Sequence, residues 1–374
     1  MRLSLLNQFF SLFSHDIGID LGTANTLIFV RGKGIAIREP SVVARHKKSK
    51  HVIAIGTEAK KMLGKTPASI ITVRPLRGGV IADFDATEAM ISHYIKQVHE
   101  MGATIPKLLA RPKVVIGIPS AVTEVERRAV WEAALAAGAR EAFLIEEPMA
   151  AAVGENISIF QSKGVMVVDI GGGTTEIAVI SLGGIVVGRS LKTAGDDMDQ
   201  AILHYIRLRH GLIIGERTAE EIKMEIGSAY EKRAKSKDQR PKNDEEGIEP
   251  DGQKGDRMMI VRGRDIETGL PRSLRITESE VREALSPIIS QIVQAIADVL
   301  EETPPELLPD ILEQGILLTG GGANLLGLDE LIVEKVHMPV IVSSDPLTSV
   351  VRGTGKVLED ERLLERVKVI GGLK

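Results

Sequence analysis

Apolar residues along the chain form short β-type runs and longer runs with helical spacing, in an order that occurs twice. In the first half, β-type runs at 17–21, 26–30 and 35–43 precede a helical stretch near 86–101, a strand at 114–118, a helix from Thr123 and a strand at 142–145. From Lys163 the order returns, with strands at 165–169, 176–181 and 184–191, a helix near 196–210, two more helices and a strand at 315–319. This repetition predicts an α/β protein with two similar lobes.

Capping boxes mark three of the predicted helix starts. They are Thr123-x-x-Glu126, Thr218-x-x-Glu221 and Thr277-x-x-Glu280, in which the Thr hydroxyl and the Glu carboxylate satisfy free backbone N–H groups. Gly138 is placed to end the first of these helices, and Pro304-Pro305 to end the last.

Three glycine-rich turns, each entered from an apolar strand, are the main chemical signal: 17–26, 167–175 and 316–323. In the first two, Asp20 and Asp169 end the strand and a Gly follows two residues later, before a second β-type run. Glycine lets backbone N–H groups approach a phosphate, and such an Asp can reach a divalent metal directly or through its waters. We therefore expect the two hairpins to clamp a metal-nucleotide between the lobes.

The alternative is that these are ordinary tight hairpins, with Asp and Gly present only as turn residues. The repetition of the pattern argues against it. Two common nucleotide motifs do not fit, because Ala59 stands where a P-loop ending in Gly64-Lys65-Thr66 needs Gly, and Glu176 stands where a dinucleotide fingerprint from Gly171 needs its third Gly.

Composition excludes several classes of protein. The 374 residues are 43% hydrophobic and 26% charged, which is typical of globular domains, and the length suffices for two of them. A formal net charge of −4 without a basic, aromatic-laced stripe argues against nucleic acid as a partner. The chain has no Cys, which excludes disulfides and thiolate metal sites, and its eight His show no zinc spacing. We find no run of about 20 apolar residues that would span a membrane.

Two segments depart from the globular pattern. Residues 231–257 hold 16 charged residues, eight of each sign, and are read as a disordered insertion; a partner-docking tail is the alternative. The first 13 residues, on a helix, would place Leu3, Leu6, Phe10 and Phe13 on one side with Phe9 beside them. Too short to span a membrane, this segment fits an interfacial anchor, unless it packs on the protein body.

Motifs spread along nearly the whole chain resemble the actin, heat-shock chaperone and sugar-kinase superfamily, and within it the MreB family of bacterial actins. The strings that carry the resemblance are Ile-Asp-Leu-Gly-Thr-Ala-Asn-Thr (19–26), Glu-Pro-Ser-Val-Val-Ala (39–44), Gly-Val-Ile-Ala-Asp-Phe (79–84), Val-Glu-Arg-Arg-Ala (125–129), Asp-Ile-Gly-Gly-Gly-Thr (169–174), Ile-Glu-Glu-Pro-Met-Ala-Ala-Ala (145–152), Gly-Gly-Gly (320–322) and Asp-Pro-Leu-Thr-Ser-Val (345–350). The resemblance implies an actin-like ATPase fold, with two ribonuclease H-like lobes and a nucleotide cleft between them. Lobe I would comprise 15–150 and 341–374, lobe II 151–340, and 1–14 the membrane-proximal segment.

The resemblance also implies ATP and Mg²⁺ as cofactors and assigns residues to them. Asp20 and Asp169 would serve the metal. The residues for the nucleotide would be Asp20, Gly22, Thr23, Ala24, Asn25, Asp169, Gly171, Gly172, Gly173, Thr174, Glu220, Lys223, Gly320, Gly321, Gly322 and Ala323. Glu220 and Lys223 would flank the ribose and purine, or form only a solvated ion pair.

Hydrolysis would depend on Glu147, which matches the family residue that orients the attacking water, with Thr174 assisting. Acidic residues are favoured at helix N-termini because the helix dipole is positive there. The alternative is that Glu147 is present only for this reason. Leu108 and Leu109 match a second membrane-inserting loop in the family.

By resemblance, the chain would be an ATPase that polymerises into filaments on the inner, cytoplasmic face of the cell membrane. There it would act with cell-wall elongation and morphogenetic proteins to maintain rod shape. Three alternatives remain: a small-molecule kinase of the same fold, a chaperone nucleotide module, and a nucleotide-locked scaffold with negligible turnover.

Overall fold

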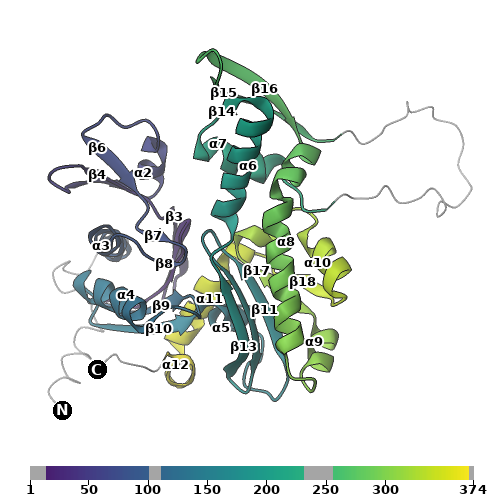
Figure 1. Ribbon diagram of the computed structural model, residues 1–374. Coiled ribbons are helices and arrows are strands. Elements are labelled where there is room, and N and C mark those ends of the chain that lie inside the picture. Colours follow the sequence, from purple (N-terminus) through teal and green to yellow (C-terminus); the bar gives the residue numbers. More distant parts are fainter. Residues whose placement is uncertain (1–13, 101–110, 231–255, 370–374) are drawn as a thin grey trace, which may run out of the picture.

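The computed structural model describes residues 14–100, 111–230 and 256–369, which form two lobes side by side (Figure 1). Each lobe is built on a five-stranded sheet, with the orders β10-β9-β1-β2-β3 and β13-β12-β11-β17-β18. The first sheet comprises β1 (Ile17–Leu21), β2 (Asn25–Val30), β3 (Gly34–Pro40), β9 (Lys113–Ile118) and β10 (Glu141–Glu146). The second comprises β11 (Val165–Ile170), β12 (Thr175–Ser181), β13 (Gly184–Leu191), β17 (Ile316–Thr319) and β18 (Val340–Val342). The predicted α/β fold with two similar lobes is confirmed.

Strand pairing places the two glycine hairpins at equivalent positions. β1 pairs antiparallel with β2 and parallel with β9, and β11 pairs antiparallel with β12 and parallel with β17. Asp20 lies opposite Gly117 of β9, and Asp169 lies opposite Thr319 of β17. Each Asp therefore stands at the carboxyl ends of adjacent parallel strands, the edge at which open α/β sheets bind ligands.

Helices cover the sheets and fill the space between them. The first lobe carries α3 (Phe84–Glu100) and α4 (Glu124–Ala136), and the second carries α6 (Gly195–His210), α7 (Glu216–Ile226), α8 (Glu278–Glu302), α9 (Leu308–Gln314) and α10 (Leu328–Val336). Within the described residues α8 alone has the length and mean hydropathy (1.2) of a membrane span, which the sequence analysis did not expect. Its apolar side, however, packs into the core of the second lobe, where Val281, Leu285 and Ile292 are fully buried. We therefore regard α8 as a core helix.

A three-stranded sheet extends each lobe on the same side of the molecule, at the top of Figure 1. The first lobe adds β4 (Val43–His46), β5 (Val52–Ile55), β6 (Ile70–Val73) with α2 (Thr57–Met62), and the hairpin β7 (Leu76–Arg77) and β8 (Val80–Ile81). The second adds β14 (Leu212–Ile213), β15 (Met258–Asp265) and β16 (Pro271–Thr277). The strand predicted at 35–43 is therefore confirmed over 35–40, but its predicted end was wrong: β3 ends at Pro40, and β4 begins a separate sheet at Val43.

Helix starts follow the capping boxes in two cases of three. Thr123 and Thr277 cap α4 and α8 as predicted, each in a complete box with its Glu. The start predicted at Thr218 was wrong, because α7 begins at Glu216 after Gly215 and holds Thr218 in its first turn. The rest of the predicted helix is present, because α7 continues to Ile226.

Two helices cross between the lobes with their backbones in contact. They are α5 (Glu147–Gly154), which connects β10 to the second lobe, and α11 (Ser349–Glu359), which follows η4 (Pro346–Thr348) and precedes α12 (Glu361–Val367). A Cβ on Gly353 would lie 1.8 Å from the carbonyl oxygen of Ala150, and one on Gly154 would lie 1.9 Å from that of Ser349. Lys356 donates to the carbonyls of Val153 and Gly154, at 2.9 and 2.7 Å, and so caps α5. The crossing is thus a tight joint, in which Gly154 and Gly353 let the two helix backbones approach closely.

Candidate functional site

A cavity of about 980 Å³ lies between the lobes, and both glycine hairpins line it. All but one of the residues expected to bind nucleotide or metal contribute to its walls: Asp20, Gly22, Thr23, Ala24, Asn25, Glu147, Asp169, Gly171, Gly172, Gly173, Thr174, Glu220, Lys223, Gly320, Gly321 and Gly322. Ala323 is the exception. It lies in η3 (Gly321–Asn324), is 6% exposed and packs into the core of the second lobe.

The two hairpins meet face to face at their tips. A Cβ on Gly172 would lie 2.5 Å from the Cβ of Ala24, and one on Gly173 would lie 2.5 Å from Oγ1 of Thr23. Side chains at these two glycines would push the lobes apart. The glycines therefore bring the backbone of each hairpin to the same point of the cavity, as two halves of one anion cradle require.

Three carboxylates converge on the floor of this cradle. Burial raises the pKa of Asp20 to about 8, with a further contribution from the charge of Asp169. Burial also raises the pKa of Asp169 to about 6; the Thr319 hydroxyl opposes this and the Glu176 charge adds to it. The pKa of Glu147 is raised well above its usual value by burial and then by Glu176, Asp20 and Asp169. Among the described residues, no Lys, Arg or His is a cause of the shifts of these three pKa values, so the three carboxylates lie together without a cation directly beside them.

Mg²⁺ suits this donor set, because it takes oxygen ligands and usually keeps several waters or phosphate oxygens. Among residues 14–100, 111–230 and 256–369, no three or more His, Cys, Asp or Glu side chains are arranged to hold a metal by themselves. The residues therefore fit a metal ion that arrives with phosphate and water ligands, next to Asp20 and Asp169.

The raised pKa values predict that the nucleotide-free protein loses stability as the pH rises. The pKa of Asp20 is about 3.8 in the unfolded chain, and burial raises it to about 8 in the folded protein. Below about pH 4 the carboxyl group is protonated in both states, and its burial does not lower the free energy of unfolding. Between about pH 4 and about pH 8 the free energy of unfolding falls progressively, because the unfolded chain loses this proton and the folded protein retains it. Melting temperatures measured without nucleotide or Mg²⁺, from about pH 5 to about pH 8, should fall less steeply in Asp20→Asn than in the wild type. Equal slopes would contradict the assignment of this pKa.

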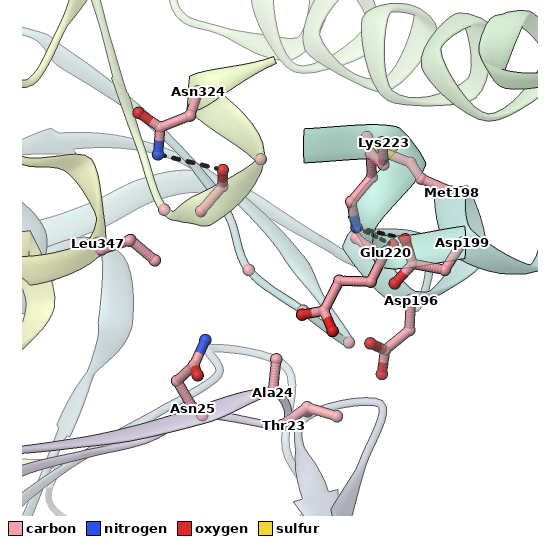
Figure 2. Close-up of a pocket in the computed structure, with 18 of the residues that line it drawn as sticks. Thr23, Ala24, Asn25, Asp196, Met198, Asp199, Glu220, Lys223, Asn324 and Leu347 are labelled. Carbon is pink, nitrogen blue, oxygen red and sulfur yellow. Dashed lines mark hydrogen bonds and ion pairs between the residues drawn. The ribbon is translucent and has the colours of Figure 1, made fainter. Parts of the chain in front are cut away.

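Glu220 and Lys223 lie on the cavity wall formed by α7 (Figure 2). Lys223 Nζ lies 2.8 Å from Asp199 Oδ1 and also donates to the carbonyl of Gly195 at 2.8 Å. Glu220 instead pairs with Lys60 of the first lobe, at 2.7 Å. Each side chain is thus held by other residues, and the structure shows no ion pair between the two.

Two further ion pairs cross the cleft near Lys60–Glu220. Arg74, between β6 and β7, lies 3.2 Å from Asp196 of α6 and 3.5 Å from Glu216 of α7. These contacts connect the small sheet of the first lobe to the helices of the second beside the cavity. We call the pairs made by Lys60 and Arg74 the cross-cleft pairs.

Sequence reasoning missed several lining residues. Met198, Asp199, Met224, Leu326 and Leu347 all border the cavity. No motif marks the first four, because they come from helices and turns that only the fold brings together. Leu347 lies in the string 345–350, to which no site residue was assigned. Acids at the start of α6 were the one available signal: Asp196 and Asp197 lie in its first turn.

Some predictions concern residues outside the described part of the chain. These are the membrane residues Leu3, Leu6, Phe9, Phe10, Phe13, Leu108 and Leu109, and most of the insertion predicted at 231–257. Asp256 and Arg257, the last two residues of that predicted insertion, are described. Arg257 borders the cavity and donates to Glu278 Oε2 at 2.8 Å and to the carbonyl of Glu225 at 3.1 Å.

Comparison with known proteins gives consistent matches over nearly the whole chain. The family described as "MreB/Mbl protein" matches residues 14–366. The cell shape-determining protein MreB of Escherichia coli (strain K12) is 49% identical over 359 residues, covering 95% of this chain and 96% of that protein. The cell shape-determining protein Mbl of Bacillus subtilis (strain 168) is 46% identical, covering 96% and 100%.

Solved structures agree with these matches. MreB5 of Spiroplasma citri bound to ADP is 37% identical with a TM-score of 0.82, covering 94% of this chain and 98% of that one. The same protein bound to AMPPNP aligns equally well, with 36% identity and a TM-score of 0.82 over 95% and 98%. A MamK filament structure, 22% identical with a TM-score of 0.72 over 92% and 98%, shares the fold.

Proposed function

The chain belongs to the MreB/Mbl family of cell shape-determining proteins, and on that premise we propose that it is an ATPase that polymerises into filaments on the inner face of the cell membrane. These filaments would organise cell-wall elongation and maintain rod shape, together with morphogenetic partner proteins. The observation that carries the proposal is the cavity in which two Asp-Gly hairpins meet over a floor of uncompensated carboxylates.

We propose ATP with Mg²⁺ as the ligand of this cavity. Backbone N–H groups of residues 22–25 and 171–173 would hold the phosphates, and Asp20 and Asp169 would hold the metal. Glu220 and Lys223 would border the ribose and purine, with 320–322 along the nucleoside. Support comes from the size of the cavity, from the two glycine hairpins and the carboxylates that line it, and from the MreB5 relative, whose structures contain ADP and AMPPNP.

Hydrolysis requires a water in line with the terminal phosphorus and no covalent nucleophile. Glu147 is the first residue of α5, is 8% exposed, and borders the cavity beside Asp20 and Asp169. Thr174 borders the same floor from the second hairpin. We propose that the Glu147 carboxylate orients the water with help from the Thr174 hydroxyl, while bound Mg²⁺ supplies charge compensation to the phosphates.

Exposed apolar residues at two ends of the second lobe support self-association. Ile260 on β15 is 67% exposed and Leu270, between β15 and β16, is 65% exposed. Leu312 on α9, at the opposite end of this lobe in Figure 1, is 54% exposed. Contacts between unlike ends produce filaments when the rotation from one subunit to the next does not close a ring.

Contacts of the described residues also support the proposed membrane surface. Ser14 and Arg111 border the segments 1–13 and 101–110, and the Arg111 N–H donates to Ser14 Oγ at 2.8 Å. The His15 N–H donates to His99 Nε2 at 3.1 Å. Both segments proposed to contact the membrane thus join the first lobe at one place, so that both can act on the same surface.

Phosphate release and sedimentation, measured on the same samples, test the core of the proposal. The wild type should release phosphate from ATP and pellet in its presence. Ile260→Glu should bind ATP equally well but remain in the supernatant, because a charge in an apolar contact is costly to bury. Pelleting without phosphate release would identify a nucleotide-locked scaffold, and phosphate transfer to a small alcohol without pelleting would identify a kinase.

Liposome flotation tests the membrane assignment. The wild type should float with vesicles, whereas a chain that begins at Ser14 should float several-fold less, because it lacks the apolar side of the N-terminal segment. Leu108→Ser/Leu109→Ser should reduce flotation further when combined with the shortened chain. Equal flotation of all these proteins would leave the proposed membrane contact without support.

A further inference from the structure

A fourth carboxylate, Glu176, lies close to the proposed hydrolytic residues and has no role in the account above. Glu176 is on β12, is 1% exposed, and forms no ion pair with any Lys, Arg or His in the described residues. Its charge is the second largest cause of the raised pKa of Glu147. Burying a carboxylate without a cationic partner lowers the free energy of unfolding. Its hydrogen-bond partners therefore indicate its role.

The hydrogen bonds of Glu176 connect the two lobes. Oε2 accepts the backbone N–H of Ser120 at 3.0 Å and also the Ser120 hydroxyl. Ser120 belongs to the turn between β9 and α4 in the first lobe. Oε1 accepts the hydroxyl of Ser190 on the neighbouring strand β13 of its own sheet. Glu176 is therefore tied to its own lobe on one side and to the opposite lobe on the other.

This link joins the chain segments that carry Glu147 and Thr174. Ser120 follows β9, whose last residue, Ile118, lies opposite Glu146 in β10, immediately before Glu147. On the other side, Glu176 is the second residue of β12, and Thr174 is in the turn immediately before that strand. Fixing Ser120 to Glu176 therefore fixes the end of the strand pair that carries Glu147 against the turn that carries Thr174.

The same region is tightly packed around Pro119, next to Ser120. A Cβ on Gly79, in the turn between β7 and β8, would lie 2.7 Å from Pro119 Cγ and 2.7 Å from Thr174 Cγ2. The Gly79 N–H donates to Thr23 Oγ1 at 3.1 Å. A shift of the Ser120 turn would therefore be transmitted to Thr174 and to the first hairpin.

We propose that Glu176 is a positioning residue that, through Ser120, sets the distance between Glu147 and Thr174 across the two lobes. The inference rests on the hydrolytic roles proposed for those two residues. It predicts that Glu176 acts on turnover and not on nucleotide affinity, because it does not border the cavity.

The test compares kcat for phosphate release with the Kd for ATP in a small set of variants. Glu176→Ala should lower kcat about tenfold, because even a small displacement of the reacting groups slows the chemical step. It should leave the Kd within about twofold. Glu176→Gln should recover most of the rate, because its amide oxygen can still accept both Ser120 bonds. Ser120→Ala, which removes only the hydroxyl donor, should lower kcat a few-fold, and Ser120→Ala/Glu176→Ala should be no slower than Glu176→Ala.

Ser190→Ala is the matched control, because it removes the bond that stays within the second lobe and should change kcat by less than about twofold. An unchanged kcat in Glu176→Ala, or a Glu176→Gln as slow as Glu176→Ala, would overturn the positioning role while the ATPase proposal stands. If Glu176→Ala does not fold, an unchanged kcat in Ser120→Ala, or a loss of about tenfold or more in Glu176→Gln, would overturn the positioning role. A wild type that releases no phosphate would instead contradict the proposed hydrolysis itself.

Discussion

Replacing Glu147 with alanine is expected to lower phosphate release from ATP by about a hundredfold or more while ATP still binds. The change removes a carboxylate from the cavity floor and leaves both glycine hairpins, which form the phosphate cradle, intact. The like charges of Glu176, Asp20 and Asp169 raise the pKa of Glu147, so its removal takes a carboxylate away from an acidic site and should not lower the affinity for Mg-ATP for electrostatic reasons. Single-turnover phosphate release and calorimetry on the same preparation separate the two quantities.

Glu146→Ala is the matched control, because Glu146 is adjacent in sequence and does not border the cavity. Its rate should stay near that of the wild type. If turnover limits the lifetime of filaments, Glu147→Ala should also pellet for longer after ATP is added. Wild-type release rates in Glu147→Ala would remove this residue from the mechanism.

Gly353→Ala is expected to destabilise the fold by about 4 kcal/mol or to prevent folding. The added methyl group would lie 1.8 Å from the carbonyl oxygen of Ala150, far inside van der Waals contact, and no flexible side chain is available to move. The two helices would have to separate, and with them the two lobes. Denaturant unfolding at constant pH measures the change.

Gly184→Ala provides the comparison, because a Cβ there meets nothing within 4 Å. Its stability should lie within about 1 kcal/mol of the wild type. Similar stability of the Gly353→Ala and Gly184→Ala proteins would show that the crossing of α5 and α11 can relax at little cost.

The parts of this fold that are predictable from sequence are those set by local backbone chemistry. Asp20 and Asp169 could be identified because the strand, the turn and the glycines lie within a few consecutive residues. The capping boxes at Thr123 and Thr277 are local for the same reason. Thr218 has the same pattern, but Gly215 begins the helix earlier, so a local signal can be overridden by its neighbours.

What could not be predicted depends on contacts between distant residues. Arg74 and Asp196 are separated by 122 positions, and no sequence pattern around either residue predicts their contact. Ala323 was placed at the nucleoside by its position after Gly320–Gly322, but η3 turns its side chain into the core. Glu176 was noticed only as the residue that breaks a glycine fingerprint, since its buried environment follows from the packing of two lobes.

The cross-cleft pairs have a consequence for how long a nucleotide stays bound. They lie beside the cavity, and the side chains of Lys60 and Glu220 are 36% and 29% exposed, so water and ions reach them. Such pairs contribute about 0–1 kcal/mol each and weaken as salt shortens the range of electrostatic attraction. Because these pairs connect the lobes beside the cavity, we expect each small contribution to lengthen the time for which the proposed nucleotide stays bound. Ionic strength should therefore change the rate of nucleotide dissociation, with slower dissociation in dilute buffer than in concentrated salt.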